Sequence, residues 1–321
     1  MEQPAPILEV RDLKKYYPAK GGGVVKAVDG ISFSLCRGTT MGLVGESGCG
    51  KSTTGRMVLR LAGSKTDGQV LFHGQDLYDL SKKELRRLRP KLQMIFQDPF
   101  SSLSPRMPVG ALIAEAVREH KLVEKSDLTA YVREIMERCG LQSFHENRYP
   151  HEFSGGQRQR ICIARALALQ PELIVCDEPV SALDVSVQAQ IVNLLTQLQK
   201  EQGLTYLFIS HDLSVVEHIA HTVGVMYLGS LVEYASTQAL FSNPLHPYTQ
   251  ILFSAIPVPD PAHPLAEIPP AGGMPSPADP PAGCKFHPRC PHCMPRCTHT
   301  VPQWREVEPG HFCACHLYPE Q

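Results

Sequence analysis

The sequence lacks the long apolar run that a membrane-spanning helix requires. None of its hydrophobic stretches approaches the roughly 18–20 residues needed to cross a bilayer. It also lacks an excess of charge of one sign, because 31 basic residues stand against 32 acidic ones. No general attraction to nucleic acid or anionic lipid is therefore implied. The N-terminus, MEQPAPILEVRDLKKYY, does not have the basic-then-apolar layout of a secretory signal, so we expect a cytosolic protein.

Internal repeats and low-complexity tracts are also missing before about residue 255. Instead, short apolar runs alternate with helical patterns, which is typical of an α/β domain with a largely parallel sheet. Apolar residues at helical spacing predict helices over 109–120 and 128–141, forming a helical insert. Two segments predict strands of an N-terminal β layer, 31–45 and 68–77. Two continuous apolar runs predict buried parallel strands, 173–176 and 204–210.

The stretch GESGCGKST matches the phosphate-binding pattern G-x-x-x-x-G-K-[ST]. It follows the apolar MGLV and precedes a helical pattern, so it has the expected strand–loop–helix context. Its glycines let backbone N–H groups converge on phosphates at a helix N-terminus. Lys51 is expected to reach the β- and γ-phosphates of ATP, and Ser52 to bind Mg²⁺; the alternative is a glycine-rich turn with a surface lysine. The predicted ATP-binding residues are Gly45, Glu46, Ser47, Gly48, Cys49, Gly50, Lys51, Ser52 and Thr53.

Two carboxylates directly follow the predicted strand in LIVCDEP, residues 173–179. Open α/β sheets bind ligands at the carboxyl ends of their strands. We therefore expect Asp177 to hold Mg²⁺, through water, and Glu178 to polarise the water that attacks the γ-phosphate. A strand that simply ends in solvated acids is the alternative for this motif taken alone.

The segment FSGGQRQR, residues 153–160, predicts a second anion-binding helix end. Ser154 is placed to cap the helix, and two glycines follow it. Taken alone, this segment is equally compatible with a simple capped helix that binds no anion. The segment is one of an ordered set, however: the phosphate loop, MIFQDP with Gln97, SGGQ, CDEP, SALD with Asp184, and ISHD with His211.

This ordered set resembles the nucleotide-binding subunits of ABC transporters, over essentially all of residues 8–255. The resemblance implies a head-to-tail dimer in which each ATP lies between one phosphate loop and the partner's signature. It implies that Gln97 senses Mg²⁺ and the permease, that His211 contacts the γ-phosphate, and that Asp184 links the two sites. Tyr17 is expected to stack on adenine, with a core aromatic as the alternative. The implied signature residues are Ser154, Gly155, Gly156 and Gln157.

Two further stretches, QDPFSSLSPRMPVG and NPLHPYTQILFSAIP, are followed by a proline-rich arm and a cysteine-rich module. This combination narrows the resemblance to the ATP-binding subunits of dipeptide and oligopeptide importers, particularly the F-type subunit. This implies an ATPase domain over 1–255, with the helical insert at about 99–165, and a proline-rich arm with a Cys-rich extension over 256–321. The implied partners are a paralogous ATPase, two permease subunits and, indirectly, an extracytoplasmic peptide-binding protein, with no nucleic acid. The implied location is peripheral, on the cytoplasmic face of the plasma membrane.

Other classes were weighed against this one. Nickel and other metal-chelate importers share the ATPase core and are the nearest alternative. A soluble translation factor usually carries two such cores, whereas this chain has one. A repair ATPase separates the phosphate loop from the signature by a long coiled coil, and no sustained heptad run occurs here.

Six of the eleven cysteines crowd into the last forty or so residues. In a reducing compartment such a cluster favours metal over disulfides. Spacing alone leaves zinc and an iron–sulfur cluster open, since Cys293 and nearby histidines allow a mixed zinc site; unligated cysteines in a loose tail are the third alternative. The resemblance favours a structural [4Fe–4S] cluster over Zn²⁺, and with a structural role Cys290→Ser is expected to leave nucleotide binding largely intact. The implied ligands are Cys284, Cys290, Cys297 and Cys315.

Overall fold

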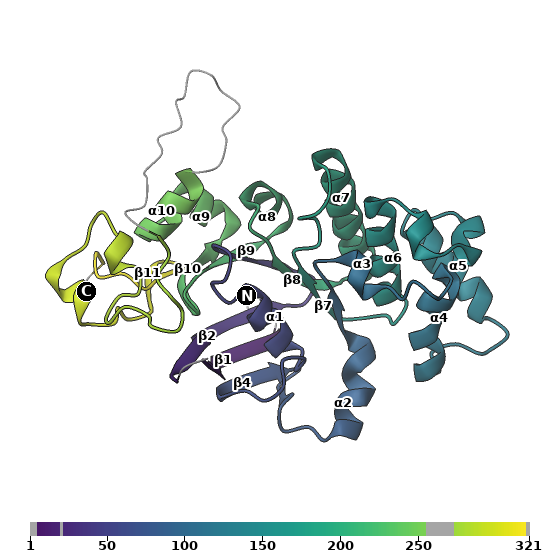
Figure 1. Cartoon of the computed structure of the whole chain (residues 1–321), viewed down its shortest axis with the longest axis horizontal. Helices are drawn as coiled ribbons and strands as arrows, with labels where there is room; N and C mark the ends of the chain where they lie inside the picture. Colours follow the sequence, from purple (N-terminus) through teal and green to yellow (C-terminus); the bar gives the residue numbers. More distant parts are fainter. Residues whose placement is uncertain (1–4, 20–21, 255–272, 319–321) are drawn as a thin grey trace, which may run out of the picture. The chain divides into compact units, whose positions relative to one another are not determined.

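The computed structural model describes residues 5–19, 22–254 and 273–318, and the chain divides into two compact units (Figure 1). The first unit contains Cys36–Thr39 and Asp79–Ile209. The second contains Ala5–Leu35, Thr40–Tyr78 and the described part of Ser210–Gln321. Within the described ranges, no helix combines the length and apolar character that crossing a membrane demands.

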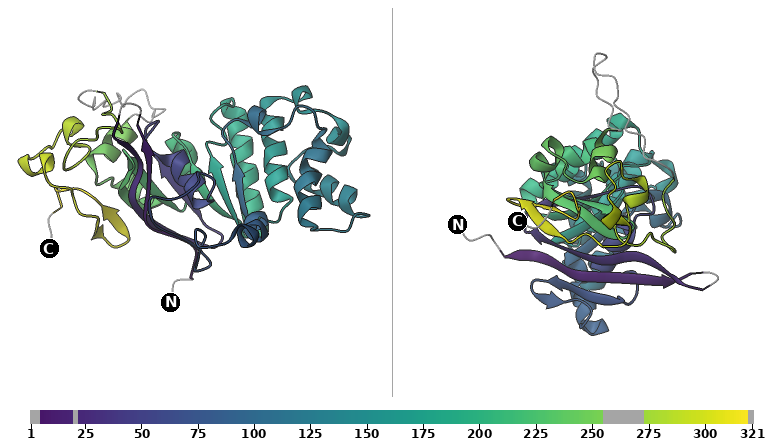
Figure 2. Two further views of the ribbon diagram at one scale, coloured as in Figure 1. Left: turned by 60° about the horizontal axis from the view of Figure 1, so that its bottom comes forward. Right: turned by 90° about the vertical axis from the view of Figure 1, so that its left-hand side faces the viewer.

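An antiparallel sheet forms the N-terminal β layer, in the order β2-β1-β4-β5. The long strands alternate buried and exposed residues, so that one face packs on the core and the other faces solvent. Figure 2 shows the two purple strands running side by side over most of their length. The strands are β1 (Pro6–Pro18), β2 (Val24–Cys36), β4 (Asp67–Phe72) and β5 (Gln75–Asp76).

The prediction of one β layer over 31–45 is wrong in one respect. The chain turns after β2, with Gly38 at φ 74°, and continues as β3 (Thr40–Val44) in a different sheet. There β3 runs parallel to β9 (Thr222–Tyr227). Every residue of β3 is buried, which is typical of a central parallel strand.

The sheet that contains β3 and β9 continues through further strands of the second unit. Strand β9 pairs antiparallel with β10 (Ser230–Ser236), β10 with β12 (His311–Cys313), and β12 with β11 (Arg305–Glu308). Gly42 lets α8 approach β3, because a Cβ there would lie 2.5 Å from Val216. The helices are α1 (Lys51–Val58), α8 (Leu213–Ile219), α9 (Thr237–Ser242) and α10 (Pro247–Ser254), with 3₁₀ turns η4 (His287–Arg289) and η5 (Pro295–Thr298).

The first unit contains three buried parallel strands. They are β6 (Leu92–Ile95), β7 (Leu173–Asp177) and β8 (Thr205–Ile209), and the predicted runs at 173–176 and 204–210 are thereby confirmed. The register pairs Ile95 with Cys176 and Asp177 with Ile209, so the three strands end at one edge. Helix α2 (Lys82–Leu88) and the turn η1 (Arg89–Lys91) precede β6, and α7 (Val185–Gln202) connects β7 to β8.

A helical subregion interrupts the strands of the first unit. Both predicted helices are present, as α4 (Val109–His120) and α5 (Leu128–Arg138), and α4 packs against α5 and α6 (Figure 1). Each buries its apolar stripe, including Ile113 and Met136 at 0% exposure. The remaining elements are α3 (Pro99–Ser102), η2 (Ser143–Asn147), η3 (Pro150–Glu152) and α6 (Gly155–Leu167).

The predicted proline-rich arm falls partly on residues 255–272, which lie outside the described residues. Its described end, 273–283, contains no helix or strand, as its proline content predicts. From there the chain forms the C-terminal module, defined here as residues 273–318.

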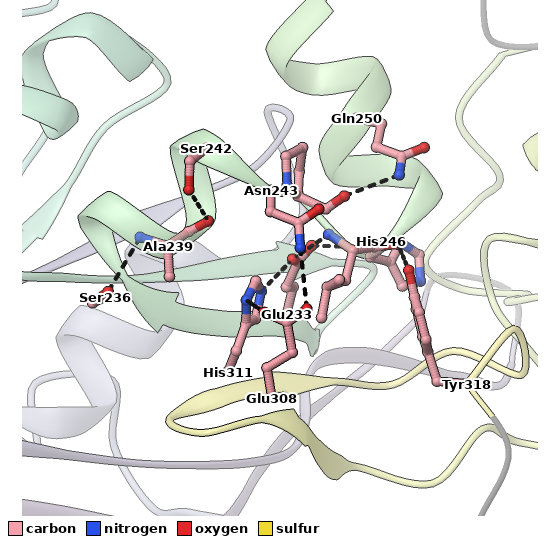
Figure 3. Close-up of polar contacts among 12 residues, drawn as sticks. Glu233, Ser236, Ala239, Ser242, Asn243, His246, Gln250, Glu308, His311 and Tyr318 are labelled. Atoms are coloured by element: carbon pink, nitrogen blue, oxygen red, sulfur yellow. Dashed lines mark hydrogen bonds and ion pairs between the residues drawn. The ribbon is translucent and has the colours of Figure 1, made fainter.

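A buried carboxylate joins this module to β10. Glu233 is 0% exposed and accepts hydrogen bonds from the backbone N–H groups of Leu245 and His246, at 2.7 and 2.9 Å. His311 on β12 donates to the same carboxylate through Nε2, at 2.7 Å (Figure 3). Tyr318 adds a second link, because its hydroxyl donates to the Leu245 carbonyl. Three donors offset the cost of burying this charge.

Candidate phosphate-binding and hydrolytic site

The predicted phosphate loop connects β3 to α1 in the second unit. Its glycines adopt backbone angles that other residues avoid, with φ 149° at Gly45 and 111° at Gly50. Close packing also requires them, since a Cβ would lie 2.3 Å from the Met226 carbonyl oxygen at Gly45 and 2.2 Å from that of Ala27 at Gly50. The loop therefore has a fixed shape that depends on glycine at these two positions.

Lys51 lies inside the curve of the loop. It is 5% exposed, and its Nζ donates to the carbonyls of Gly45 and Glu46 at 2.6 and 3.0 Å. Helix α1 begins at Lys51, directly after the loop. The first N–H groups of the helix thus lie beside the ammonium group, an arrangement suited to phosphate.

Several groups outside the motif support the loop. The Glu46 N–H donates to the Tyr248 hydroxyl at 2.8 Å, and the Gly229 N–H donates to the Cys49 carbonyl at 2.8 Å. The Glu46 carboxylate forms a two-pronged ion pair with Arg289 of the C-terminal module, both bonds being 3.0 Å. Burial raises the pKa of the Cys49 thiol, which keeps it neutral.

His211 and Tyr17 also belong to the second unit. His211 is exposed just before α8, and Asp212 caps that helix by accepting from the N–H groups of Ser214 and Val215. Tyr17 is 37% exposed, with the Lys15 ammonium 4.8 Å from its ring, so it is a surface aromatic. Tyr16 instead donates its hydroxyl to Asp29.

The first unit brings two predicted catalytic residues together. Glu178 follows β7 with φ 47°, a strained left-handed conformation, and its N–H donates to the Ile209 carbonyl at 3.0 Å. The Gln97 Nε2 donates to the Glu178 carboxylate at 2.9 Å. Asp177, at the end of β7, is 1% exposed. Strand ends thus place an amide and two carboxylates at one edge of the first unit.

Ser154 caps α6 as expected. Its hydroxyl accepts from the Gln157 N–H, and the Gln157 side chain accepts from the Ser154 N–H, forming a capping box. Gly156 has a packing role as well, since a Cβ there would lie 2.4 Å from Val187 of α7. The exposed end of α6 therefore combines a fixed cap with accessible backbone.

Asp184 is the N-cap residue of α7 but makes no side-chain capping bond there. It is exposed, and Val185 beside it is 81% exposed.

The predicted cluster ligands gather in the C-terminal module. The Cys284 N–H donates to the Cys297 carbonyl at 2.8 Å. Burial, and then the neighbouring Cys315, Cys297 and Cys290 thiols, raises the pKa of Cys284 to about 12. These four sulfurs therefore lie within electrostatic range of one another. Even so, no group of three or more His, Cys, Asp or Glu side chains in the described ranges is placed to hold a metal ion.

Sequence reasoning missed Arg289, Tyr248 and Glu233. The first two contact the phosphate loop, and the third joins the module to β10. The sequence held only one indication of these contacts, since CKFHPRC places charged and aromatic residues between two cysteines.

Comparisons with known proteins agree with this geometry. A family model described as ABC transporter matches residues 28–181. A second model, described as oligopeptide/dipeptide transporter, C-terminal region, matches residues 232–297.

Similar curated proteins span almost the whole chain. The oligopeptide transport ATP-binding protein AppF of Bacillus subtilis is 54% identical, covering 97% of each chain. The putative oligopeptide transport ATP-binding protein YkfD of the same organism is 55% identical, covering 98% of this chain and 96% of its own.

Two solved structures share the fold. CbiO1 of Clostridium perfringens, part of an ABC transporter complex, has a TM-score of 0.65 at 27% identity, covering 74% of this chain and 91% of its own. The dimeric bacterial ABC transporter cassette MJ0796 has a TM-score of 0.65 at 26% identity, covering 72% and 98%.

Proposed function

This chain belongs to the ABC transporter family, and we propose that it is the ATPase subunit of a di- or oligopeptide importer. The observation that carries the proposal is the combination in one chain of a phosphate loop and a C-terminal region typical of oligopeptide and dipeptide transporters. Relatives that are more than half identical over nearly the full length are named for oligopeptide transport.

The residues of the site divide the chemistry between them. Lys51 and the N–H groups at the start of α1 bind the β- and γ-phosphates. Ser52, Gln97 and Asp177 would hold Mg²⁺, and the ion would neutralise charge on the phosphates. Glu178, oriented by Gln97, accepts the proton of the attacking water, and His211 contacts the γ-phosphate. Tyr17 stacks on adenine.

A partner is required because the signature acts on the other subunit's ATP. The dimeric cassette of similar fold supports such an assembly, as does the exposed Asp184–Val185 pair. The helical subregion exposes Phe100 and Phe144, each 63% exposed, which suits docking to a permease at the cytoplasmic face of a membrane. The partners are then a paralogous ATPase and two permease subunits, with a peptide-binding protein on the other side.

The isolated protein should hydrolyse ATP poorly, and its rate should rise when the paralogous ATPase and the permease are added. The reason is that each site needs Ser154–Gln157 of the other subunit. The measurement is phosphate release over a dilution series. Full turnover per molecule that does not change on dilution would contradict the composite site.

Transport assays test the substrate class. The complete transporter in proteoliposomes should take up labelled di- or oligopeptides with ATP, and Lys51→Ala should stop uptake. ATP-dependent uptake of a nickel chelate without peptide uptake would instead support the metal-chelate alternative.

The C-terminal module is the second part of the proposal: Cys284, Cys290, Cys297 and Cys315 hold a structural [4Fe–4S] cluster. Four thiols gathered from separate segments support it. Metal analysis of the purified protein decides between this cluster and zinc.

Anaerobically purified protein is expected to be brown, with broad absorption near 400 nm, and to contain about four irons per chain. Elemental analysis and absorption spectra measure this directly. Cys290→Ser should lose the iron, while Cys139→Ser, at a buried cysteine of the first unit, should keep it. Colourless protein with one zinc per chain would contradict the cluster.

A further inference from the structure

Residues 285–289, the segment between Cys284 and Cys290, contact the phosphate loop and its supports at three places. All of these residues lie within the second unit. The segment is built to be rigid: the 3₁₀ turn η4 occupies its end, and the N–H groups of Arg289 and Cys290 donate back to Phe286 and His287 at 3.0 and 3.3 Å.

The first contact is the pair between Arg289 and Glu46. The guanidinium donates through both terminal nitrogens to both carboxylate oxygens, the strongest geometry for such a pair. The Arg289 side chain is 6% exposed and that of Glu46 30%, so solvent screens the pair only partly. The guanidinium also lies 5.9 Å from the ring centres of both Tyr227 and Phe286.

The second contact runs through Phe286. Its side chain is 1% exposed and packs on Tyr248 and Tyr227, with ring centres 5.4 and 5.2 Å away. Tyr248 in turn accepts the Glu46 N–H. Phe286 therefore supports Tyr248, which holds the backbone of the loop at Glu46. Arg289 binds the carboxylate of the same residue.

The third contact runs through Lys285. Its ammonium donates to the Leu228 carbonyl, the Ser230 hydroxyl and the Asp29 carboxylate, at 2.8, 2.7 and 2.8 Å. Leu228 and Ser230 flank Gly229, whose N–H donates to the Cys49 carbonyl. Lys285 thus holds the turn that supports the far side of the loop.

We propose that residues 285–289 position the phosphate-binding loop, with Arg289 as a positioning residue for ATP. The proposal rests on the ATPase function proposed above.

A double-mutant cycle tests the contact in the full-length chain. The dissociation constant of AMP-PNP with Mg²⁺, measured by calorimetry, should rise about fivefold in Arg289→Met, the low end of coupling between sites. In a Glu46→Gln background the same replacement should have no further effect, because its target is already gone. An equal effect in both backgrounds would mean that Arg289 acts on the phosphates directly, and would overturn the proposal.

Two further variants complete the test. Tyr318→Phe removes a link between the module and the Leu245 carbonyl without touching the loop, and should leave the dissociation constant unchanged. If it weakens binding as much as Arg289→Met, general loosening explains the result and the positioning role fails. Arg289→Lys, which keeps the charge but loses the fork, should show a smaller effect in the same direction, and serves if Arg289→Met does not fold.

Lys51→Ala separates this proposal from the ATPase function: wild-type protein that binds no nucleotide refutes the function. Wild-type binding that Lys51→Ala abolishes and Arg289→Met leaves intact refutes the positioning alone.

Discussion

Glu178→Gln should retain ATP binding and lower steady-state hydrolysis by at least about 100-fold, the contribution of a positioned general base. Glutamine keeps the size of the side chain and its contact with Gln97 but cannot accept a proton from water. The Glu178 N–H bonds to the Ile209 carbonyl, and the Glu178 carboxylate bonds to Gln97. The position of the carboxylate is therefore fixed, and another side chain cannot readily take over its role. The measurement is phosphate release by the assembled transporter, with binding of ATP measured in parallel.

Lys51→Ala should behave in the opposite way, losing nucleotide affinity itself, because it removes the buried ammonium from the loop. Glu172→Gln provides a matched control, since it lies at the opposite end of β7 and pairs with Lys91, away from Gln97 and Glu178. It should hydrolyse ATP like the wild type. Near-normal hydrolysis by Glu178→Gln would count against the assignment of Glu178 as the base.

Local features of the fold were predictable from the sequence. Helix α4 begins and ends at the predicted residues, and Ser154 caps α6, because periodicity and capping depend on neighbours a few positions away. The paired carboxylates at Asp177 and Glu178 follow a buried strand for the same local reason. The apolar pattern of residues 31–45 continues across the turn at Gly38, so the sequence did not reveal that β3 joins another sheet.

Contacts between distant segments were not predictable in this way. Glu46 and Arg289 are 243 positions apart, and Glu233 and His311 are 78 apart. Nothing local at either residue indicates its partner, since an acid in a glycine-rich loop or on a strand is equally compatible with solvent. Only the assembled fold brings such groups together, and burial then makes the contact strong.

The contact at Glu233 should dominate the stability of the C-terminal module. Glu233→Ala leaves two backbone N–H groups and the His311 imidazole without their acceptor in a buried site. Breaking a buried charged contact in this way costs about 3–5 kcal/mol of unfolding free energy. The strands β10 and β12 meet at this position, with Glu233 opposite Cys313. The substitution should therefore weaken the attachment of the module to β10.

The single tryptophan reports on this region. Trp304 precedes β11 and stacks on Phe312 of β12, with ring centres 6.1 Å apart. Urea unfolding followed by its fluorescence should show a markedly lower midpoint in Glu233→Ala. Glu308→Ala is the matched control: this acid also lies near His311, but at 4.0 Å and half exposed (Figure 3). The free energy of unfolding of Glu308→Ala should differ from that of the wild type by no more than about 0.5 kcal/mol. Equal midpoints for the two variants would mean that the buried carboxylate does not hold the module to β10.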